Sequence, residues 1–190
     1  CLGLGCGHAQ KLKPDPRAIT MWGSDFTAAQ ARSKTSGKLV LIDFTGSDWC
    51  GWCKLMDKNV FAEEVWKTYA KDNVLLVTLD FPNDKSIVPE KYVKRNKKLQ
   101  EQFEVGGFPT YVVLDNDGET KLGQLGAGRD KTPSSFIDEF KGVVRMSDGA
   151  IEAFLKANPD KAAGYKAAIE EFQTSKKSLM AWLETGPATS

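Results

Sequence analysis

Two nearly continuous apolar runs constrain the fold of this chain more than any other feature. Residues 38–44 (KLVLIDF) and residues 73–80 (NVLLVTLD) consist largely of Val, Leu, Ile and Phe. Apolar runs without strict polar alternation are typical of strands that are buried on both faces of a sheet. A helical pattern over residues 51–71, with an expected break near Asn59, separates the two runs. The order strand, helix, strand therefore indicates an α/β protein in which helices cover a central sheet.

The other predicted elements extend this alternation. Three more segments have a helical pattern: residues 24–36, with Ser24 as the cap, residues 89–103 and residues 133–144. The sequence DNDG at residues 115–118 lies between extended runs at residues 110–114 and 119–125, which is a strong hairpin signal. Because a hairpin is antiparallel, we expect the sheet to be mixed.

The chain is predicted to have three parts. Residues 1–18 read as a leader and linker, residues 19–145 as the main domain, and residues 146–190 as a helical extension. Apolar side chains recur at helical spacing along this extension, and we expect them to pack on the main domain. They are Tyr165, Ile169, Phe172, Leu179 and Leu183.

One pair of cysteines indicates redox chemistry. Cys50 and Cys53 follow the first predicted strand and open a helix, whereas a framework of structural disulfides would scatter cysteines through the domain. The free N–H groups and the dipole at a helix N-terminus favour a thiolate, so we expect an exposed Cys50 whose pKa is lowered. Cys53, one turn further, is predicted to resolve a mixed disulfide on Cys50.

Three short motifs together resemble the thioredoxin family. They are LIDF at residues 41–44, DWCGWCK at residues 48–54 and GFPT at residues 107–110. The similarity covers residues 21–144 and is greatest to secreted bacterial thioredoxin-like proteins with a WCGWC motif. It implies the thioredoxin fold, a central mixed sheet flanked by helices, here with extra C-terminal helices. It also implies a thiol–disulfide oxidoreductase that acts on protein thiols and disulfides.

The resemblance also implies roles for single residues. Asp43 matches the buried carboxylate that exchanges a proton with the resolving cysteine through water; the alternative is a simple buried carboxylate at the end of a strand. Pro109 matches a cis-proline that faces the cysteine pair. Phe108, just before it, would offer backbone hydrogen bonds to an extended substrate.

The residues around the motif form the rest of the predicted substrate site. Trp49 matches the tryptophan that shields the cysteines, and Gly51 and Trp52 lie between them. Together with Phe108 the two tryptophans form either an apolar docking patch or ordinary packing around the motif.

The sequence departs from the family pattern at four places. One extra residue separates Asp43 from the motif, and Leu76 stands where thioredoxin has the lysine that partners this carboxylate. Trp52 replaces a proline. The segment at residues 81–102 is longer than in thioredoxin and is a candidate for partner recognition.

Other functions fit the cysteine pair less well. An inert structural disulfide is one alternative, and a zinc site is another, but zinc takes four ligands and the only further candidates are Cys1, Cys6 and His8. We therefore expect no metal and no cofactor besides the redox-active disulfide. A thioredoxin-fold adaptor or chaperone without redox turnover remains the alternative function.

Composition and the N-terminus bear on partners and location. The net charge of +1 lacks the basic field of a nucleic-acid binder, so no nucleic acid is expected. The first residues, CLGLGCGHAQ, are typical of the end of an export signal, of a lipoprotein with Cys1 or Cys6 as its first mature residue, or of a flexible leader. We expect an exported protein, periplasmic or lipoprotein-anchored, with a membrane electron donor that keeps the pair reduced.

Overall fold

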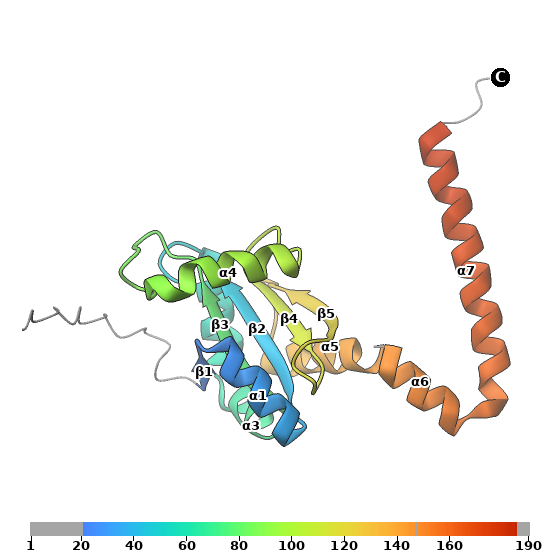
Figure 1. Ribbon diagram of the computed structural model, residues 1–190, viewed down its shortest axis with the longest axis horizontal. Coiled ribbons are helices and arrows are strands. Elements are labelled where there is room, and N and C mark those ends of the chain that lie inside the picture. The colour runs from blue at the N-terminus through green and yellow to red at the C-terminus, as the bar shows by residue number, and fades with distance from the viewer. Residues whose placement is uncertain (1–20, 147, 186–190) are drawn as a thin grey trace, which may run out of the picture. The chain divides into compact units, whose positions relative to one another are not determined.

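The computed structural model describes residues 21–146 and 148–185 (Figure 1). The chain divides into two compact units, Cys1–Met146 and Ser147–Ser190. The predicted leader, with Cys1, Cys6 and His8, lies outside the described residues.

A mixed sheet forms the centre of the first unit, as expected, and it has five strands. The strand order is β1-β3-β2-β4-β5. The strands are β1 (Trp22–Gly23), β2 (Leu39–Thr45), β3 (Val74–Asp80), β4 (Thr110–Leu114) and β5 (Lys121–Gly126). β1 and β2 pair parallel to β3, whereas β4 pairs antiparallel to both β2 and β5. The parallel core and the antiparallel hairpin therefore meet at β2, the central strand.

Two details of the strands differ from the sequence-based expectation. β1 was not predicted, because two residues carry no recognisable period. β5 begins at Lys121 rather than at residue 119. The reason is the Asp117 carboxylate, which accepts hydrogen bonds from the backbone N–H groups of Glu119 and Thr120 at 2.8 Å each. These bonds keep both residues in the turn.

The helices of the first unit lie where helical patterns were expected, with one correction. They are α1 (Phe26–Ser36), α2 (Gly51–Met56), the π-helical segment η1 (Asp57–Phe61), α3 (Glu64–Asn73), α4 (Glu90–Gln102) and α5 (Pro133–Arg145). Asp25, not Ser24, caps α1, because its carboxylate accepts from the N–H of Ala28 at 3.0 Å. The helical pattern over residues 51–71 is interrupted by η1, at the break expected near Asn59.

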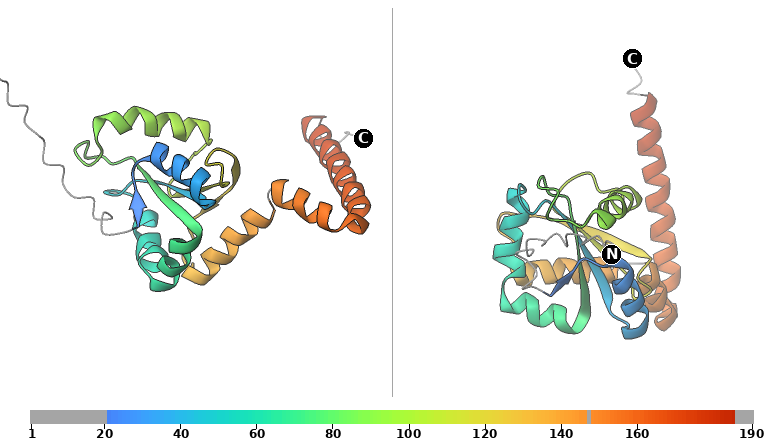
Figure 2. Two further views of the ribbon diagram at one scale, coloured as in Figure 1. Left: turned by 60° about the horizontal axis from the view of Figure 1, so that its bottom comes forward. Right: turned by 60° about the vertical axis from the view of Figure 1, so that its left-hand side comes forward.

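Helices cover both faces of the sheet (Figure 2), and one apolar cluster packs on each face. Val40, Ile42 and Phe44 of β2 pack with residues of α1 and α4. Leu41 packs with residues of α2, η1, α3 and α5 on the other face. Successive side chains of a strand point to opposite faces, so Asp43 shares the face of Leu41. The buried Asp43 therefore lies on the side of the sheet that α2 covers.

The second unit contains the expected extra C-terminal helices, α6 (Asp148–Ala157) and α7 (Pro159–Thr185). Several large apolar side chains on these helices are exposed: Phe154, Phe172, Leu179, Met180 and Trp182. Within the part of the chain that the structure describes, no helix combines the length and the hydropathy needed to cross a membrane. Packing of this unit on the first one stays a prediction.

Candidate active site

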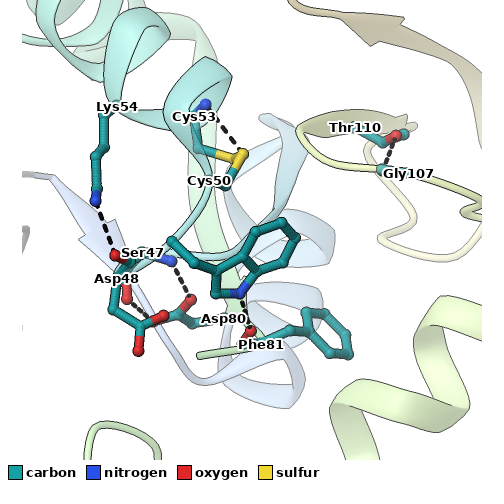
Figure 3. The surroundings of a disulfide bond; sticks show 10 residues. Ser47, Asp48, Cys50, Cys53, Lys54, Asp80, Phe81, Gly107 and Thr110 are labelled. Carbon is teal, nitrogen blue, oxygen red and sulfur yellow. Dashed lines mark hydrogen bonds between the residues drawn. A yellow bond between two sulfur atoms is a disulfide. The ribbon is translucent and has the colours of Figure 1, made fainter. Parts of the chain in front are cut away.

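Hydrogen bonds to the end of β3 hold the loop between β2 and α2 in place (Figure 3). The backbone N–H and the hydroxyl of Ser47 both donate to the Asp80 carboxylate, at 2.9 Å and 2.5 Å. The N–H of Cys50 donates to the carbonyl of Gly46 at 2.8 Å, which turns the chain into α2. The start of α2 is thus positioned by the carboxyl ends of two neighbouring parallel strands.

Asp48 joins this loop to the segment after β3. Its carboxylate accepts from the N–H groups of Asn83 at 3.0 Å and Asp84 at 2.9 Å. Backbone hydrogen bonds, above all the one from Asp84, lower the pKa of Asp48 because they stabilise the charged form. Lys54 of α2 donates to the backbone carbonyl of Asp48 at 2.8 Å, which Figure 3 shows as a link from the helix back to the loop.

Cys50 and Cys53 form a disulfide across the first turn of α2. Cys50 is the N-cap residue, and its sulfur accepts from the N–H of Cys53 at 3.1 Å. The expectation of an exposed Cys50 is wrong for this oxidised form, because the residue is only 4 % exposed. The disulfide draws the first sulfur over the helix end toward Cys53, which is itself buried. The pair nevertheless has the predicted position at a helix N-terminus.

The loop before β4 contains the expected cis-proline. The Phe108–Pro109 peptide bond is cis. Pro109 is buried and Phe108 is half-buried. The hydroxyl of Thr110 donates to the carbonyl of Gly107 at 2.8 Å and closes the loop (Figure 3). Contact between this loop and the motif runs through Trp49, whose ring lies 5.8 Å from that of Phe108, centre to centre.

Phe81 is a site residue that the sequence analysis did not single out. Its carbonyl accepts from the indole N–H of Trp49 at 2.9 Å. Its ring lies 5.1 Å from the ring of Phe108 and 6.3 Å from that of the core residue Phe44. Phe81 therefore connects the motif and the cis-proline loop to the core. The only sequence signal was its place at the start of the long segment after β3.

The two motif tryptophans are half exposed, Trp49 at 46 % and Trp52 at 47 %. Gly46 makes room for the first, because a Cβ atom there would lie 2.3 Å from Cε2 of Trp49. Gly51 is exposed, and a Cβ atom there would meet nothing within 4 Å. The guanidinium of Arg129 lies over the Trp52 ring at 6.0 Å. Exposed indoles thus flank the covered disulfide.

Asp43 is 2 % exposed and lies in β2, opposite Thr78 of β3 and Tyr111 of β4 in the strand register. It shares the sheet face of Met56, the last residue of α2. Leu76, which we expect at the position of the thioredoxin lysine, packs in the same apolar cluster and brings no charge to Asp43. The carboxylate is therefore beneath the helix that carries Cys53.

Comparisons with known proteins give the family of the chain. The model of the thioredoxin-like domain family matches residues 26–138, more than half of the chain. The chain belongs to the thioredoxin-like family. Among curated relatives, the disulfide bond reductase DsbH of Chlamydia pneumoniae is 34 % identical over 119 residues, which cover 63 % of this chain and 70 % of the relative.

Two further relatives support the assignment. A thioredoxin H-type of Oryza sativa subsp. indica is 31 % identical over 133 residues, covering 70 % of this chain and 88 % of the relative. A solved structure of a DsbH oxidoreductase superposes with a TM-score of 0.60 at 30 % identity, covering 66 % of this chain and 84 % of that one. Family and geometry together make this thioredoxin-like protein a thiol–disulfide oxidoreductase with a CxxC motif.

The thioredoxin-like domain offers little for a metal. Among residues 21–146 and 148–185, no group of three or more His, Cys, Asp or Glu side chains is placed to hold an ion. The two motif sulfurs lie one helical turn apart and can exchange a disulfide with a partner.

Proposed function

We propose that this thioredoxin-like oxidoreductase reduces disulfides in exported proteins, with Cys50 as the nucleophile and Cys53 as the resolving thiol. The observation that carries the proposal is the position of Cys50 at the N-cap of α2, with Cys53 one turn on and in disulfide linkage with it. A helix N-terminus stabilises a thiolate, and the thiolate is the form that attacks.

The exchange has two steps, and each step breaks one sulfur–sulfur bond and forms another. In the reduced protein the Cys50 thiolate attacks one sulfur of a substrate disulfide, and the other substrate sulfur leaves and takes a proton. Cys53 then loses its proton and attacks the Cys50 sulfur. This step restores the Cys50–Cys53 disulfide and releases the second substrate thiol. Two electrons pass to the substrate and no further cofactor is needed.

Asp43 is proposed as the group that takes the proton of Cys53 through water. Its burial on the α2 side of the sheet supports this role. A base at this place would assist the second attack, in which Cys53 must become a thiolate, and would leave the first attack unchanged.

The substrate is proposed to bind in extended form along the cis-proline loop. Phe108, before Pro109, would hydrogen-bond to the backbone of the substrate as an added strand does. The half-exposed rings of Trp49 and Trp52 would contact side chains on either side of the substrate cysteine. Gly51, between Cys50 and Trp52 in the sequence, would be part of the same surface. Aromatic surface of this kind provides much contact area with few rotatable bonds.

The reducing direction and the location are proposals of their own. The relative from Chlamydia pneumoniae is named a disulfide bond reductase, and the sequence CLGLGCGHAQ at the start of the chain is typical of an export signal or a lipoprotein. A reductase in an oxidising periplasm must be recharged by a donor, so we propose a membrane electron carrier as its partner, in addition to protein disulfides.

Insulin reduction by dithiothreitol tests the activity. The wild type is expected to accelerate precipitation of the insulin B chain and Cys50→Ser to abolish the acceleration. Cys53→Ser, reduced and then freed of dithiothreitol, is expected to accumulate a mixed disulfide with insulin. Cys6→Ser is the matched control, since it removes a cysteine outside the motif. Equal rates for the wild type and Cys50→Ser would reject the enzyme and favour an adaptor or chaperone. Equilibration with glutathione then measures the potential and decides the direction.

A further inference from the structure

Arg129 extends the surface around the disulfide beside Trp52. It follows β5, in the connection to α5, and its Cζ atom lies 6.0 Å from the centre of the Trp52 ring. A guanidinium at this distance from an indole face is attracted by the ring. Because Trp52 immediately precedes Cys53, this contact brings a positive charge to the edge of the redox site.

The connection that carries Arg129 has a defined conformation. Lys131 bridges it, donating to the carbonyl of Gly126 at 2.8 Å and pairing with Glu139 of α5 at 2.5 Å. Gly128 permits this bridge, because a Cβ atom there would lie 2.8 Å from Cγ of Lys131. Thr132 then caps α5. Hydrogen bonds on both sides of Arg129 thus fix the backbone from which it reaches Trp52.

The charge of Arg129 is available to a partner. Lys131 has its charge balanced by Glu139, whereas Arg129 is exposed and makes no ion pair with any described residue. It lines an open groove of about 510 Å³ beside η1. The other residues along this groove are Lys58, Asn59, Glu63, Asp130, Lys131 and Thr132. The groove is lined by both positive and negative side chains. Among them, the guanidinium of Arg129 lies over Trp52 of the motif.

We infer that Arg129 is a specificity residue of the proposed reductase site, which selects substrate segments with a carboxylate beside the reactive cysteine. The inference rests on the proposed function and adds a substrate class to it. A guanidinium presents two parallel N–H donors that match the two oxygens of a carboxylate. A Glu or Asp of the substrate that passes over Trp52 would meet these donors while the substrate sulfur lies at Cys50.

Two disulfide-linked peptides test this inference. They are identical except for Glu or Gln next to the cysteine that is attacked. The wild type is expected to reduce the Glu peptide with a kcat/KM about two- to fivefold higher at low salt, the range of an exposed ion pair. The difference should arise in KM and shrink at 0.5 M NaCl, because salt screens exposed charges. A wild type that does not discriminate between the peptides overturns the inference.

Substitutions assign the preference to Arg129. Arg129→Gln is expected to bring the Glu-to-Gln ratio of kcat/KM to about one, and Arg129→Glu to reverse it. Arg145→Gln, the matched control, removes the same charge at the other end of α5, about 18 Å along the helix axis, and should keep the wild-type ratio. A variant Arg129→Gln with an unchanged ratio would overturn the inference even if both of its rates fall.

The same assay separates this inference from the function on which it rests. If the wild type reduces the Gln peptide but shows no preference for Glu, the reductase stands and the role of Arg129 is wrong. If it reduces neither peptide while thioredoxin reduces both, the proposed function fails, and the inference about substrate class fails with it.

Discussion

The indole N–H of Trp49 donates to the backbone carbonyl of Phe81 at 2.9 Å. This bond adds to those of Asp48 in joining the loop before the CxxC motif to the segment after β3, and the ring of Phe81 contacts Phe108 beside the cis-proline. Trp49 and Phe108, which border the proposed substrate site, therefore both contact Phe81, and Phe81 supports the two sides of the site. Changes to that support are expected to affect both the stability of the fold and the binding of substrate.

Gly46→Ala is expected to displace Trp49, because the new Cβ atom would overlap an indole that is held by its hydrogen bond to Phe81. Loss of that bond and local repacking should reduce the free energy of unfolding by about 1–3 kcal/mol. Urea unfolding followed by tryptophan fluorescence measures the free energy of unfolding, and the native fluorescence reports the displacement of Trp49. Gly142→Ala is the control: its Cβ meets nothing within 4 Å in a helix, so it should be neutral or stabilise by about 0.5–1 kcal/mol. Equal destabilisation by both variants would contradict this account.

Phe81→Ala is expected to remove the ring contact with Phe108 and to leave the backbone carbonyl that accepts from Trp49. Truncating a half-buried ring should cost about 2–4 kcal/mol of stability and raise the KM for disulfide peptides. Phe81→Leu keeps an apolar side chain against Phe44 and loses only the ring contacts, so it should recover most of the stability while KM stays raised. Unfolding curves and peptide kinetics on the same preparations check the prediction, which fails if KM follows stability in both variants.

Asp48→Asn is expected to lower stability at pH 7 by weakening the bonds from Asn83 and Asp84. The pKa of Asp48 is lowered from 3.8 in the folded protein. At a pH above the pKa that Asp48 has in the unfolded chain, its charged form therefore stabilises the native state. This contribution disappears as the pH falls through the lower pKa that Asp48 has in the folded protein.

The measurement for Asp48 is the difference in urea midpoint between the wild type and Asp48→Asn from pH 7 to pH 2. The difference should be constant above about pH 5 and shrink toward zero below pH 3.8. Asp138→Asn, at an exposed carboxylate of α5, serves as the control for the loss of one negative charge. A difference that is independent of pH would show that the carboxylate charge of Asp48 plays no part.

Asp43→Asn is expected to slow release of the mixed disulfide by about tenfold or more, because a positioned base contributes to proton transfer. Formation of the mixed disulfide should keep its rate. Stopped-flow mixing of reduced protein with a chromogenic disulfide measures the two steps separately. If both steps slow equally, Asp43 is a buried strand residue and not a proton acceptor for Cys53.

Local sequence patterns were sufficient for the parts of the fold that depend on neighbouring residues. The apolar runs of β2 and β3 predict buried strands because their residues cannot be exposed without cost. The motif at residues 50–53 predicts a redox pair at a helix start, because this prediction also depends only on residues that are close in the sequence. The choice between Ser24 and Asp25 as a cap was beyond this reasoning, since both side chains can accept the same hydrogen bond.

Contacts between distant segments were decided by the tertiary structure. The sheet order β3-β2-β4-β5 brings the loops after β2, β3 and β5 and the loop before β4 to one end of the sheet. Only there do Trp49, Phe81 and Phe108 meet, and only there does Arg129 reach Trp52. No pattern along the chain encodes these neighbours, because each depends on how separate elements pack. The sequence by itself thus determined the chemistry of the site, and packing determined which side chains surround it.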